Sequence, residues 1–296
     1  MKGHTIKEWI LATRPWSFPA SSMPVIVTMA FLWGKGIEMS WCLGIMALVN
    51  IILVHAAGNV WSDYHDYKKG VDAEDTYGVR ILTDKLFTPK EVLCLSVTLQ
   101  VLAVAMGLLM VYLTGITLLW FGLAGIALSL LYSPLKYAAL GDLVIMACYA
   151  LLPMLGTTFI CSGEIVPEVL WLAVPVGSIT VAILHANNTR DIETDRRAKI
   201  HTFAMLTGRR FAIGMYVFEL VLPYLWLIIT AFMGLVSPRT LLTLITLPIA
   251  IGNCKKMLSY HTGGIKAIAN LDEATAKLQL AFSLVLAISL ITDALI

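Results

Sequence analysis

The stretch Asn59-Val-Trp-Ser-Asp63-Tyr-His-Asp66-Tyr-Lys-Lys-Gly-Val-Asp72 decides how the chain is organised. It lies at the polar end of a long apolar segment that begins near Trp41. If that segment continues as a helix at about 100° per residue, Asn59, Asp63 and Asp66 fall within about 60° of one another. Three oxygen-bearing side chains on one helix face at a membrane boundary are energetically costly, and this cost indicates a functional site.

A second polar face of the same kind occurs far downstream, in Asn187-Asn-Thr-Arg-Asp191-Ile-Glu-Thr-Asp195. In both stretches an asparagine precedes an aspartate by one helical turn, at 59/63 and at 187/191. A single interfacial aspartate usually only solubilises a helix end, but two matched sets favour a functional interpretation. Mg²⁺ takes oxygen ligands and commonly bridges carboxylates to substrate phosphates, and its charge offsets the charge that builds on a departing diphosphate. The two faces therefore predict a site for Mg²⁺ and a phosphorylated substrate.

The composition is that of an integral membrane protein. The 296 residues are 58% hydrophobic and 14% charged, with a mean hydropathy of +0.82, whereas soluble domains carry about 25% charged residues. The net charge of +2 is too small to indicate nucleic-acid binding. The N-terminal residues lack the apolar core and cleavage site of a signal peptide, so we expect the first span to be retained. The five cysteines include no Cys-x-x-Cys pair, which favours free thiols over a metal-thiolate site.

Apolar segments of about 18 residues or more predict the membrane spans. Residues 92–135 carry no charge, are too long for one crossing, and break naturally at Thr114-Gly115. We expect an all-α fold with nine transmembrane helices, at about 17–34, 41–62, 92–112, 116–134, 142–162, 168–189, 211–233, 238–254 and 274–294.

The placement of basic residues predicts the orientation. With nine helices and a cytoplasmic N-terminus, all 21 lysines and arginines except Lys35 and Arg239 fall in cytoplasmic segments, as the positive-inside rule requires. Both acidic faces then open long cytoplasmic loops, and each loop later contains a Gly-x-Arg or Gly-Arg sequence. We therefore expect one transmembrane domain over residues 1–296, built from two pseudo-repeat halves at roughly 1–135 and 136–296.

Basic residues near the two faces are further candidates. Lys68, Arg80 and Lys199 follow the faces along the chain, although membrane topology alone could account for such residues. Arg190 lies inside the second face, directly before Asp191. A guanidinium at this position can bind phosphate oxygens or hold the aspartates in place.

Three other polar positions or pairs leave more than one interpretation open. Tyr132 and Lys136 occupy a short segment in which we expect Pro134 to end a helix, and both could face the cytoplasmic mouth. His55, one turn before Asn59, either positions an acceptor hydroxyl or is an ordinary satisfied histidine. Glu219, deep in an apolar span, could pair with a base, stay protonated or contact the acceptor.

Three segments carry a family resemblance. These are Asn59-x3-Asp63-x2-Asp66, Tyr132-Ser-Pro-Leu-Lys136 and Asn188-x-Arg190-Asp191-x3-Asp195-x3-Lys199-x2-Thr202. They resemble the UbiA superfamily of intramembrane aromatic prenyltransferases, and the opening Ala12-Thr-Arg14-Pro15-Trp-Ser-Phe-Pro19 is similar too. The forms Asp-Tyr-Lys-Lys-Gly-Val-Asp and Asn-Asn-x-Arg-Asp look most like the 1,4-dihydroxy-2-naphthoate polyprenyltransferases of menaquinone synthesis. The likeness runs from about residue 9 to residue 210.

The resemblance implies nine helices around a central cavity in which a polyprenyl diphosphate and an aromatic acceptor react. The diphosphate ionises, the ring attacks the carbocation, and a naphthoate ring loses its carboxylate as CO₂ to give demethylmenaquinone. Carried over by position, the ligands of Mg²⁺ are Asn59, Asp63, Asp66, Asp191 and Asp195. The substrate-binding residues are Asn59, Lys68, Arg80, Asn188, Arg190, Lys199, Arg14 and His55, and Tyr132 and Lys136 join the four aspartates as catalytic residues.

One departure and two alternatives accompany this prediction. Thr83-Asp84-Lys85-Leu86 replaces the Gly-rich step that usually follows the first motif in this family, which puts the conformation of the covering loop in question. The acceptor could instead be 4-hydroxybenzoate, a tocopherol-type ring, haem or chlorophyllide. A cation-coupled transporter is a second class of function, although transporter sites tend to lie near the bilayer midplane. We expect a bacterial cytoplasmic membrane with the active site facing the cytoplasm.

Overall fold

The structure, a computed structural model of the chain, describes residues 4–69, 81–137, 140–197 and 202–293, with the backbone alone at 69, 129–130, 132–134 and 136–137. The described ranges are helical throughout, joined by short turns, and contain no strand. The elements are α1 (Ile6–Ala12), η1 (Pro15–Ser17), α2 (Pro19–Gly34), α3 (Trp41–Lys69), α4 (Pro89–Thr114), α5 (Thr117–Tyr137), α6 (Gly141–Met146), the π-helical turn η2 (Ala147–Leu151), α7 (Leu152–Ser162), η3 (Pro167–Val169), α8 (Leu170–Arg190), α9 (Ile192–Arg197), α10 (Phe203–Thr207), α11 (Arg209–Phe232), η4 (Pro238–Thr246), α12 (Leu247–Leu258), α13 (Tyr260–Gly263), α14 (Ile265–Ile268) and α15 (Leu271–Asp293).

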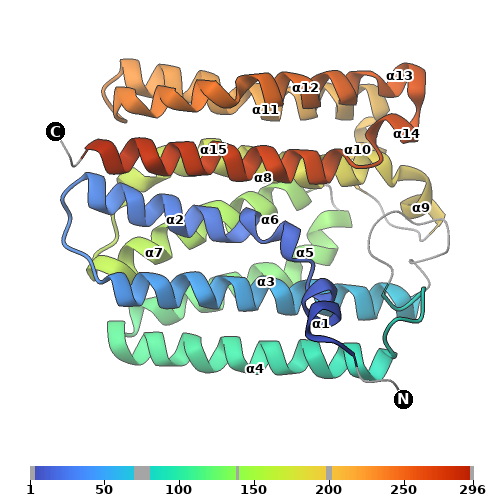
Figure 1. Cartoon of the computed structure of the whole chain (residues 1–296), viewed down its shortest axis with the longest axis horizontal. Helices are drawn as coiled ribbons and strands as arrows, with labels where there is room; N and C mark the ends of the chain where they lie inside the picture. Colours follow the sequence, from blue (N-terminus) through green and yellow to red (C-terminus); the bar gives the residue numbers. More distant parts are fainter. Residues whose placement is uncertain (1–3, 70–80, 138–139, 198–201, 294–296) are drawn as a thin grey trace.

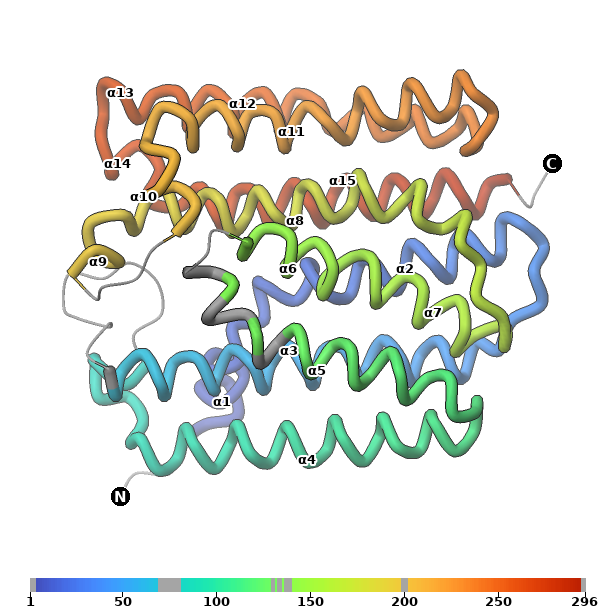
Figure 2. The backbone as a smooth tube through the Cα atoms, turned by 180° about the vertical axis from the view of Figure 1, so that it is seen from behind, coloured from blue at the N-terminus to red at the C-terminus, as the bar shows by residue number. Residues whose placement is uncertain are grey.

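The long helices lie side by side along the length of the molecule (Figure 1). α3 packs against α4 and α2, α2 packs against α15, and α8 packs against both α11 and α15. The short helices α9, α10, α13 and α14 gather at one end, on the right in Figure 1 and on the left in the reverse view of Figure 2. Long apolar rods with short polar elements at one end are the arrangement expected of a membrane-spanning bundle.

Seven of the described helical segments are long and apolar enough to cross a membrane, judged by length and composition. Two more apolar helices, Pro19–Gly34 and Thr117–Leu128, are shorter. Each of the nine apolar segments expected from the sequence coincides with a helix or a run of adjoining helices. The all-helical membrane fold is therefore confirmed, while nine crossings and a cytoplasmic N-terminus remain predictions.

One expected boundary was wrong. Pro134 does not end its helix, because α5 continues to Tyr137. A proline removes only one backbone donor, and membrane helices accommodate that loss through neighbouring groups. The helix that carries the apolar span 41–62 continues to Lys69, as expected for the first polar face, so all three polar residues of that face lie on α3.

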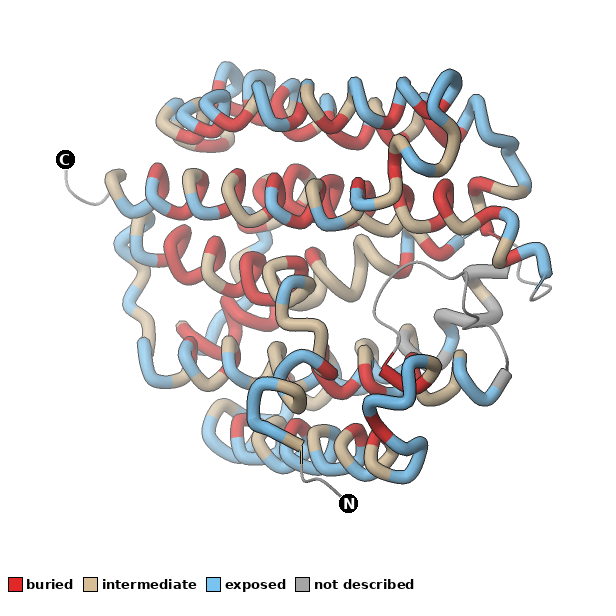
Figure 3. Tube along the Cα trace, turned by 45° about the vertical axis from the view of Figure 1, so that its right-hand side comes forward, coloured by how far each residue is buried: buried red, intermediate tan, exposed pale blue. Residues whose placement is uncertain are grey.

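Burial separates the inner helices from the outer ones. In the apolar window of α8, 72% of the residues are buried, against 17% in that of α4. The outer surface of α4 presents large apolar side chains such as Val101, Leu108 and Tyr112, which suits contact with lipid. Figure 3 shows buried residues along the central helices and exposed residues on the outer turns. α8 is thus the helix best placed to carry polar groups inside the protein.

A close approach brings α6 against α8. A Cβ atom built on Gly177 of α8 would lie 2.3 Å from the Sδ of Met146 and 2.7 Å from the Cβ of Ala150. A side chain at this position would therefore push α6 and η2 away from α8. Gly177 thereby allows Asp142, in the first turn of α6, to lie beside α8.

Candidate active site

The first polar face lies on the last turns of α3. Asp63 is buried, with 2% of its surface exposed, and Asp66 is partly buried. The Oγ of Ser62 donates a hydrogen bond to the Oδ2 of Asp66 over 3.1 Å. The helical geometry that the sequence predicted for this face is confirmed, because α3 is continuous through all three residues.

The N-terminal segment supplies the partners of this face. The Nη2 of Arg14 forms an ion pair with the Oδ1 of Asp63. The Nδ2 of Asn59 donates to the carbonyl of Thr13 and to the Oγ of Ser17, each over 3.0 Å. Arg14, predicted to bind substrate, is therefore seen here as the counter-ion of an aspartate, and Thr13 and Ser17 are site residues that the sequence reasoning missed.

Packing of α1 holds Arg14 in place. Ala12 is fully buried in a cluster with Val60 of α3 and Phe87, and the ring of Trp9 lies 4.7 Å from that of Phe87. Arg14 follows directly with a left-handed backbone, φ 56° and ψ 59°. This conformation is unfavourable for a residue with a Cβ, and surrounding contacts must maintain it.

A capping box orders the start of α1. The side chain of Thr5 accepts from the N–H of Glu8, whose carboxylate accepts from Thr5 in return. Hydrogen bonds from the backbone and then the side chain of Thr5 lower the pKa of Glu8. α1 is therefore defined at its first turn as well as through its packing.

His55 is a buried and hydrogen-bonded residue. Its Nδ1 lies 2.8 Å from the Oγ of Ser21 and its Nε2 lies 3.4 Å from the Oγ of Ser17. Its ring also meets that of Tyr149 edge to face at 5.3 Å. These contacts fit the interpretation of His55 as a satisfied intramembrane histidine, and a role in substrate binding stays a prediction.

The second polar face lies at the end of α8 and on α9, and Arg190 organises it. The guanidinium donates from Nε and Nη2 to both carboxylate oxygens of Asp191, each over 2.8 Å. It also donates to the Oδ1 of Asn187 over 2.8 Å and to the carbonyl of Ala269 over 3.1 Å, and pairs with Asp272 at 3.0 Å. Of the two roles open for Arg190, the structure shows it holding the aspartate.

The other members of this face are enclosed. Asn188 is 6% exposed and Asp195 is 8% exposed. The N–H of Asp195 donates to the carbonyl of Asp191 over 2.8 Å, which fixes α9 as a continuation of the α8 end. Asp272, at the start of α15, is a further site residue that the sequence did not reveal.

The two faces lie at the same end of the molecule. The C-terminal end of α3 and the α8–α9 junction both lie on the right in Figure 1 and on the left in Figure 2. Lys68 of α3 is exposed, with its Nζ 5.0 Å from the centre of the Tyr64 ring. The predicted common end for the two motifs is thus observed.

Some predicted site residues are not placed. Arg80 and Lys199 lie outside the described residues. Tyr132 and Lys136 lie on α5, and their side chains are outside the described part of the chain. The segment around Thr83–Leu86 forms a turn closed by a 2.9 Å hydrogen bond from the N–H of Leu86 to the carbonyl of Ile81, with Lys85 at φ 56°.

The donor atoms at this end fit Mg²⁺. Both faces offer carboxylate and amide oxygens, which are the ligands that this hard ion prefers. Two of the carboxylates, those of Asp63 and Asp195, are buried, and a buried carboxylate requires nearby positive charge. Arg14 pairs with Asp63 and Arg190 pairs with Asp191, so each face combines oxygen donors with a nearby cation.

Comparison with known proteins defines the family. The profile of the UbiA prenyltransferase family matches residues 22–264, and the chain belongs to this family. The protein called UbiA prenyltransferase domain-containing protein 1 is similar over most of the chain. The Xenopus tropicalis protein is 34% identical over 280 residues, covering 92% of this chain and 78% of the relative, and the Homo sapiens protein is 34% identical over 285 residues, covering 94% and 81%.

Solved structures share the fold. An apo UbiA homolog from Aeropyrum pernix K1 matches with a TM-score of 0.66 at 16% identity, covering 96% of this chain and 99% of the other. A UbiA homolog from Archaeoglobus fulgidus bound to GPP and Mg²⁺ matches with a TM-score of 0.63 at 14% identity, covering 96% and 99%.

The family decides the general class of function. The chain is a membrane enzyme that transfers prenyl groups, and the transporter interpretation is set aside. The prediction of menaquinone synthesis is not specifically supported, because the similar proteins named above do not identify the acceptor. The prediction of a bacterial membrane is likewise unsupported, since the curated relatives compared here are animal proteins.

Proposed function

We propose that this enzyme transfers a polyprenyl group from polyprenyl diphosphate to 1,4-dihydroxy-2-naphthoate with Mg²⁺, releasing CO₂ and giving demethylmenaquinone. The observation that carries the prenyl-diphosphate part is the pair of oxygen-rich faces at one end of the bundle, each with an aspartate held by an arginine. A diphosphate leaving group needs concentrated positive charge close to its oxygens as the C–O bond breaks.

The metal-binding residues of this proposal are Asn59, Asp63, Asp66, Asp191 and Asp195. Mg²⁺ bound there supplies charge that stabilises the departing diphosphate. Lys68, Arg80, Lys136 and Lys199 contact phosphate oxygens, Tyr132 lies near the bond that breaks, and Asn188 and His55 help to position the substrates. These assignments extend the family motif to the residues of this chain.

The two arginines take a different role in the proposal. The guanidinium of Arg190 has its donors directed at Asp191, Asn187, Asp272 and a backbone carbonyl, so we assign it to fixing the ligand geometry. Arg14 acts on Asp63 in the same way. Both arginines also lower the electrostatic cost of placing carboxylates at the membrane boundary.

The apolar surroundings complete the mechanism. An allylic carbocation survives only where water is excluded, and the enclosed α8 and its neighbours provide such an interior. We propose that nine helices surround the reaction cavity and that its mouth faces the cytoplasm, since the basic residues are concentrated on that side. Labelling of single cysteines at positions 35 and 90 by an impermeant reagent, from each side of sealed vesicles, tests this orientation.

The naphthoate acceptor follows from the Asn-Asn-x-Arg-Asp form of the second motif. The test is an assay of membranes with Mg²⁺, a series of prenyl diphosphates, and 1,4-dihydroxy-2-naphthoate, 4-hydroxybenzoate and other aromatic acceptors separately. Mass spectrometry of the lipid product identifies the chain length and the acceptor together. We expect prenylated naphthoquinol, and a product formed only from another acceptor would overturn the acceptor while leaving prenyl transfer intact.

A further inference from the structure

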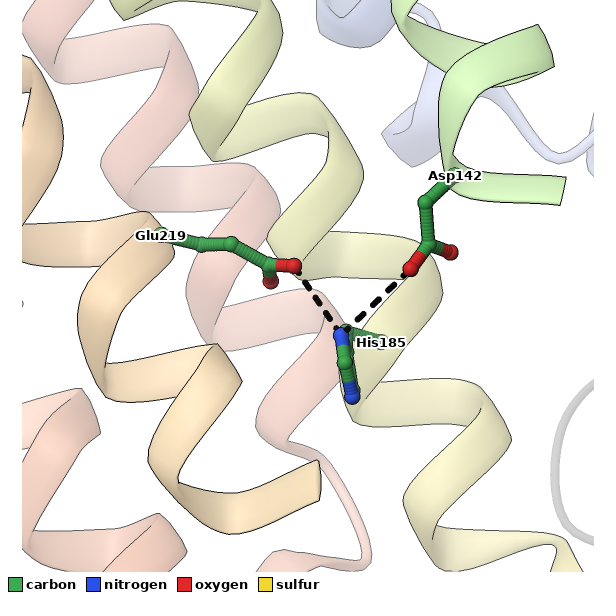
Figure 4. A group of neighbouring side chains, drawn as sticks. All are labelled: Asp142, His185 and Glu219. Atoms are coloured by element: carbon green, nitrogen blue, oxygen red, sulfur yellow. Dashed lines mark hydrogen bonds and ion pairs between the residues drawn. The ribbon is translucent and has the colours of Figure 1, made fainter. Parts of the chain in front are cut away.

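Three ionisable side chains meet between α6, α8 and α11, apart from the two polar faces (Figure 4). The Nδ1 of His185 lies 3.0 Å from the Oε1 of Glu219 and 3.8 Å from the Oδ2 of Asp142. One atom from each residue lies within 4.8 Å of the others. The sequence left three roles open for Glu219, and the structure shows it paired with a base.

The group is enclosed and its polar atoms are incompletely bonded. His185 is 1% exposed and Glu219 is 5% exposed, while Asp142 is partly exposed and gives the group an open side. The Oε2 of Glu219 and the Nε2 of His185 are buried and have no hydrogen-bond partner in the described part of the chain. Buried polar atoms in native proteins are nearly always satisfied, so the Oε2 of Glu219 indicates a missing partner, whereas the Nε2 of His185 lies on the ring edge away from both carboxylates (Figure 4).

The balance of charge points to a cation. Among the described residues, His185 is the only basic group paired with either carboxylate. Even a protonated imidazole would leave the three groups with net negative charge if both carboxylates are ionised. In the interior of a membrane protein such charge is relieved by pairing, by protonation of a carboxyl group or by a metal ion.

The scaffold holds the three residues in place. Gly177 permits the close approach of α6 to α8, and the Oγ of Ser178 donates to the backbone carbonyl of Glu219 over 2.8 Å. α8 and α11 also pack along their lengths. The ligand atoms are therefore carried by fixed helices, as a selective metal site requires.

We propose that Asp142, His185 and Glu219 bind one divalent cation of the zinc class. Ligands about 2.0–2.1 Å from tetrahedral Zn²⁺ lie about 3.4 Å from one another. The observed separations of 3.0 and 3.8 Å lie on either side of this value, so shifts of a few tenths of an ångström bring these contacts into range. One imidazole with two carboxylates is a donor set for Zn²⁺ and its neighbours in the first transition series, whereas Mg²⁺ prefers oxygen alone.

This site differs in position and purpose from the Mg²⁺ site. His185 of α8 lies nearly two helical turns before Asp191, which directly follows that helix, and neither Asp142 nor Glu219 belongs to a polar face. A cation here joins α6, α8 and α11 through one bond to each helix. The inference does not depend on the proposed acceptor or on the transfer reaction.

Binding to the wild-type chain is the first test. The full-length protein in detergent, cleared of metal and held in excess Mg²⁺ so that the oxygen-rich faces are occupied, is titrated with Co²⁺ and separately with Zn²⁺. We expect one equivalent to bind, visible in the ligand-field absorption of Co²⁺. X-ray absorption of the Zn²⁺ form should show an imidazole and oxygen ligands. Failure to bind under excess Mg²⁺, or sulfur ligands from the cysteines, would overturn the proposal.

Variants locate the ion. Glu219→Gln, Asp142→Asn and His185→Asn should each weaken Co²⁺ binding about 10-fold or more. The control His55→Asn changes a buried histidine on α3 that is bonded to Ser21, and Asp191→Asn changes a polar face, so both should keep wild-type Co²⁺ affinity. Equal Co²⁺ binding by all three ligand variants and the wild type would disprove the assignment. Loss of prenyl transfer with Co²⁺ binding retained would bear only on the proposed function.

Discussion

Each of the two polar faces contains an aspartate paired with an arginine, but the arginine comes from a different part of the chain in each face. Asp191 is held by the residue directly before it, in a bidentate contact made within one motif. Asp63 is held by Arg14, which lies 49 positions away and reaches it only because α1 packs against α3. A local pair depends on one motif, whereas the distant pair depends on the folding of a separate segment.

The surroundings of the two arginines differ as well. The side chain of Arg190 is 6% exposed, and that of Arg14 is 32% exposed. Arg190 contacts acceptors from α8 and from the segment leading into α15, so it also joins two parts of the bundle. Arg14 joins the N-terminal segment to α3. The comparison therefore predicts equal importance of the aspartates for catalysis and unequal importance of the arginines for stability.

The largest effect is expected when either aspartate loses its charge. Asp63→Asn and Asp191→Asn should each reduce prenyl transfer by about 100-fold or more, because each removes an anionic ligand from the proposed Mg²⁺ site. Turnover in membranes, normalised to the amount of inserted protein, measures this. If one variant keeps wild-type turnover, that face is not part of the metal site.

The next largest effect is a difference in stability between variants of the two arginines. Arg190→Gln should lower the free energy of unfolding by about 4 kcal/mol, since it removes the bonds of a buried guanidinium to Asp191, Asp272 and the carbonyl of Ala269. Arg14→Gln should lower it by about 2 kcal/mol, because Arg14 is the more exposed arginine and its side chain joins fewer groups than that of Arg190. Unfolding by SDS in mixed micelles measures both. Equal losses would contradict the distinction drawn between the two regions.

A smaller effect is expected at the remote partner of Arg190. Asp272→Asn removes one carboxylate but leaves Arg190 bonded to Asp191. We expect a loss of about 1 kcal/mol in unfolding free energy and less than about a 3-fold change in turnover. The matched substitution Glu273→Gln, one residue further along α15, serves as the control. A loss of activity as large as that of Asp191→Asn would make Asp272 a functional ligand.

The smallest effect concerns the anchor of the first face. Ser17→Ala removes the hydroxyl that accepts from Asn59 and donates to the carbonyl of Arg14. The expected loss is about 1 kcal/mol in unfolding free energy, because Asn59 keeps its bond to the carbonyl of Thr13. Ser162→Ala, at the last residue of α7, is the comparison variant. If Ser17→Ala has no effect, the N-terminal segment is not held through Asn59.

Sequence patterns predicted the helices well because long apolar segments determine membrane spans. The helical arrangement of the first polar face could also be predicted, because its residues are close together in the chain. The contacts of Arg190 with Asp191 follow from adjacency in the chain. The contacts of Arg14 with Asp63, of Arg190 with Asp272, and of His185 with Asp142 and Glu219 join separate helices. No periodicity specifies such pairs, since they arise from tertiary packing. The course of α5 past Pro134 was mispredicted because its environment tolerates a lost donor.

The position of Arg14 has a consequence for how the protein is made. Synthesis proceeds from the N-terminus, so this cation has left the ribosome before α3 is complete. When Asp63 emerges at the membrane boundary, its counter-ion is already there, and insertion does not wait for any later helix. Asp191 is synthesised directly after Arg190, the cation with which it pairs. Asp63 and Asp191 are therefore both synthesised after their paired arginines, in the order in which translation delivers the two polar faces.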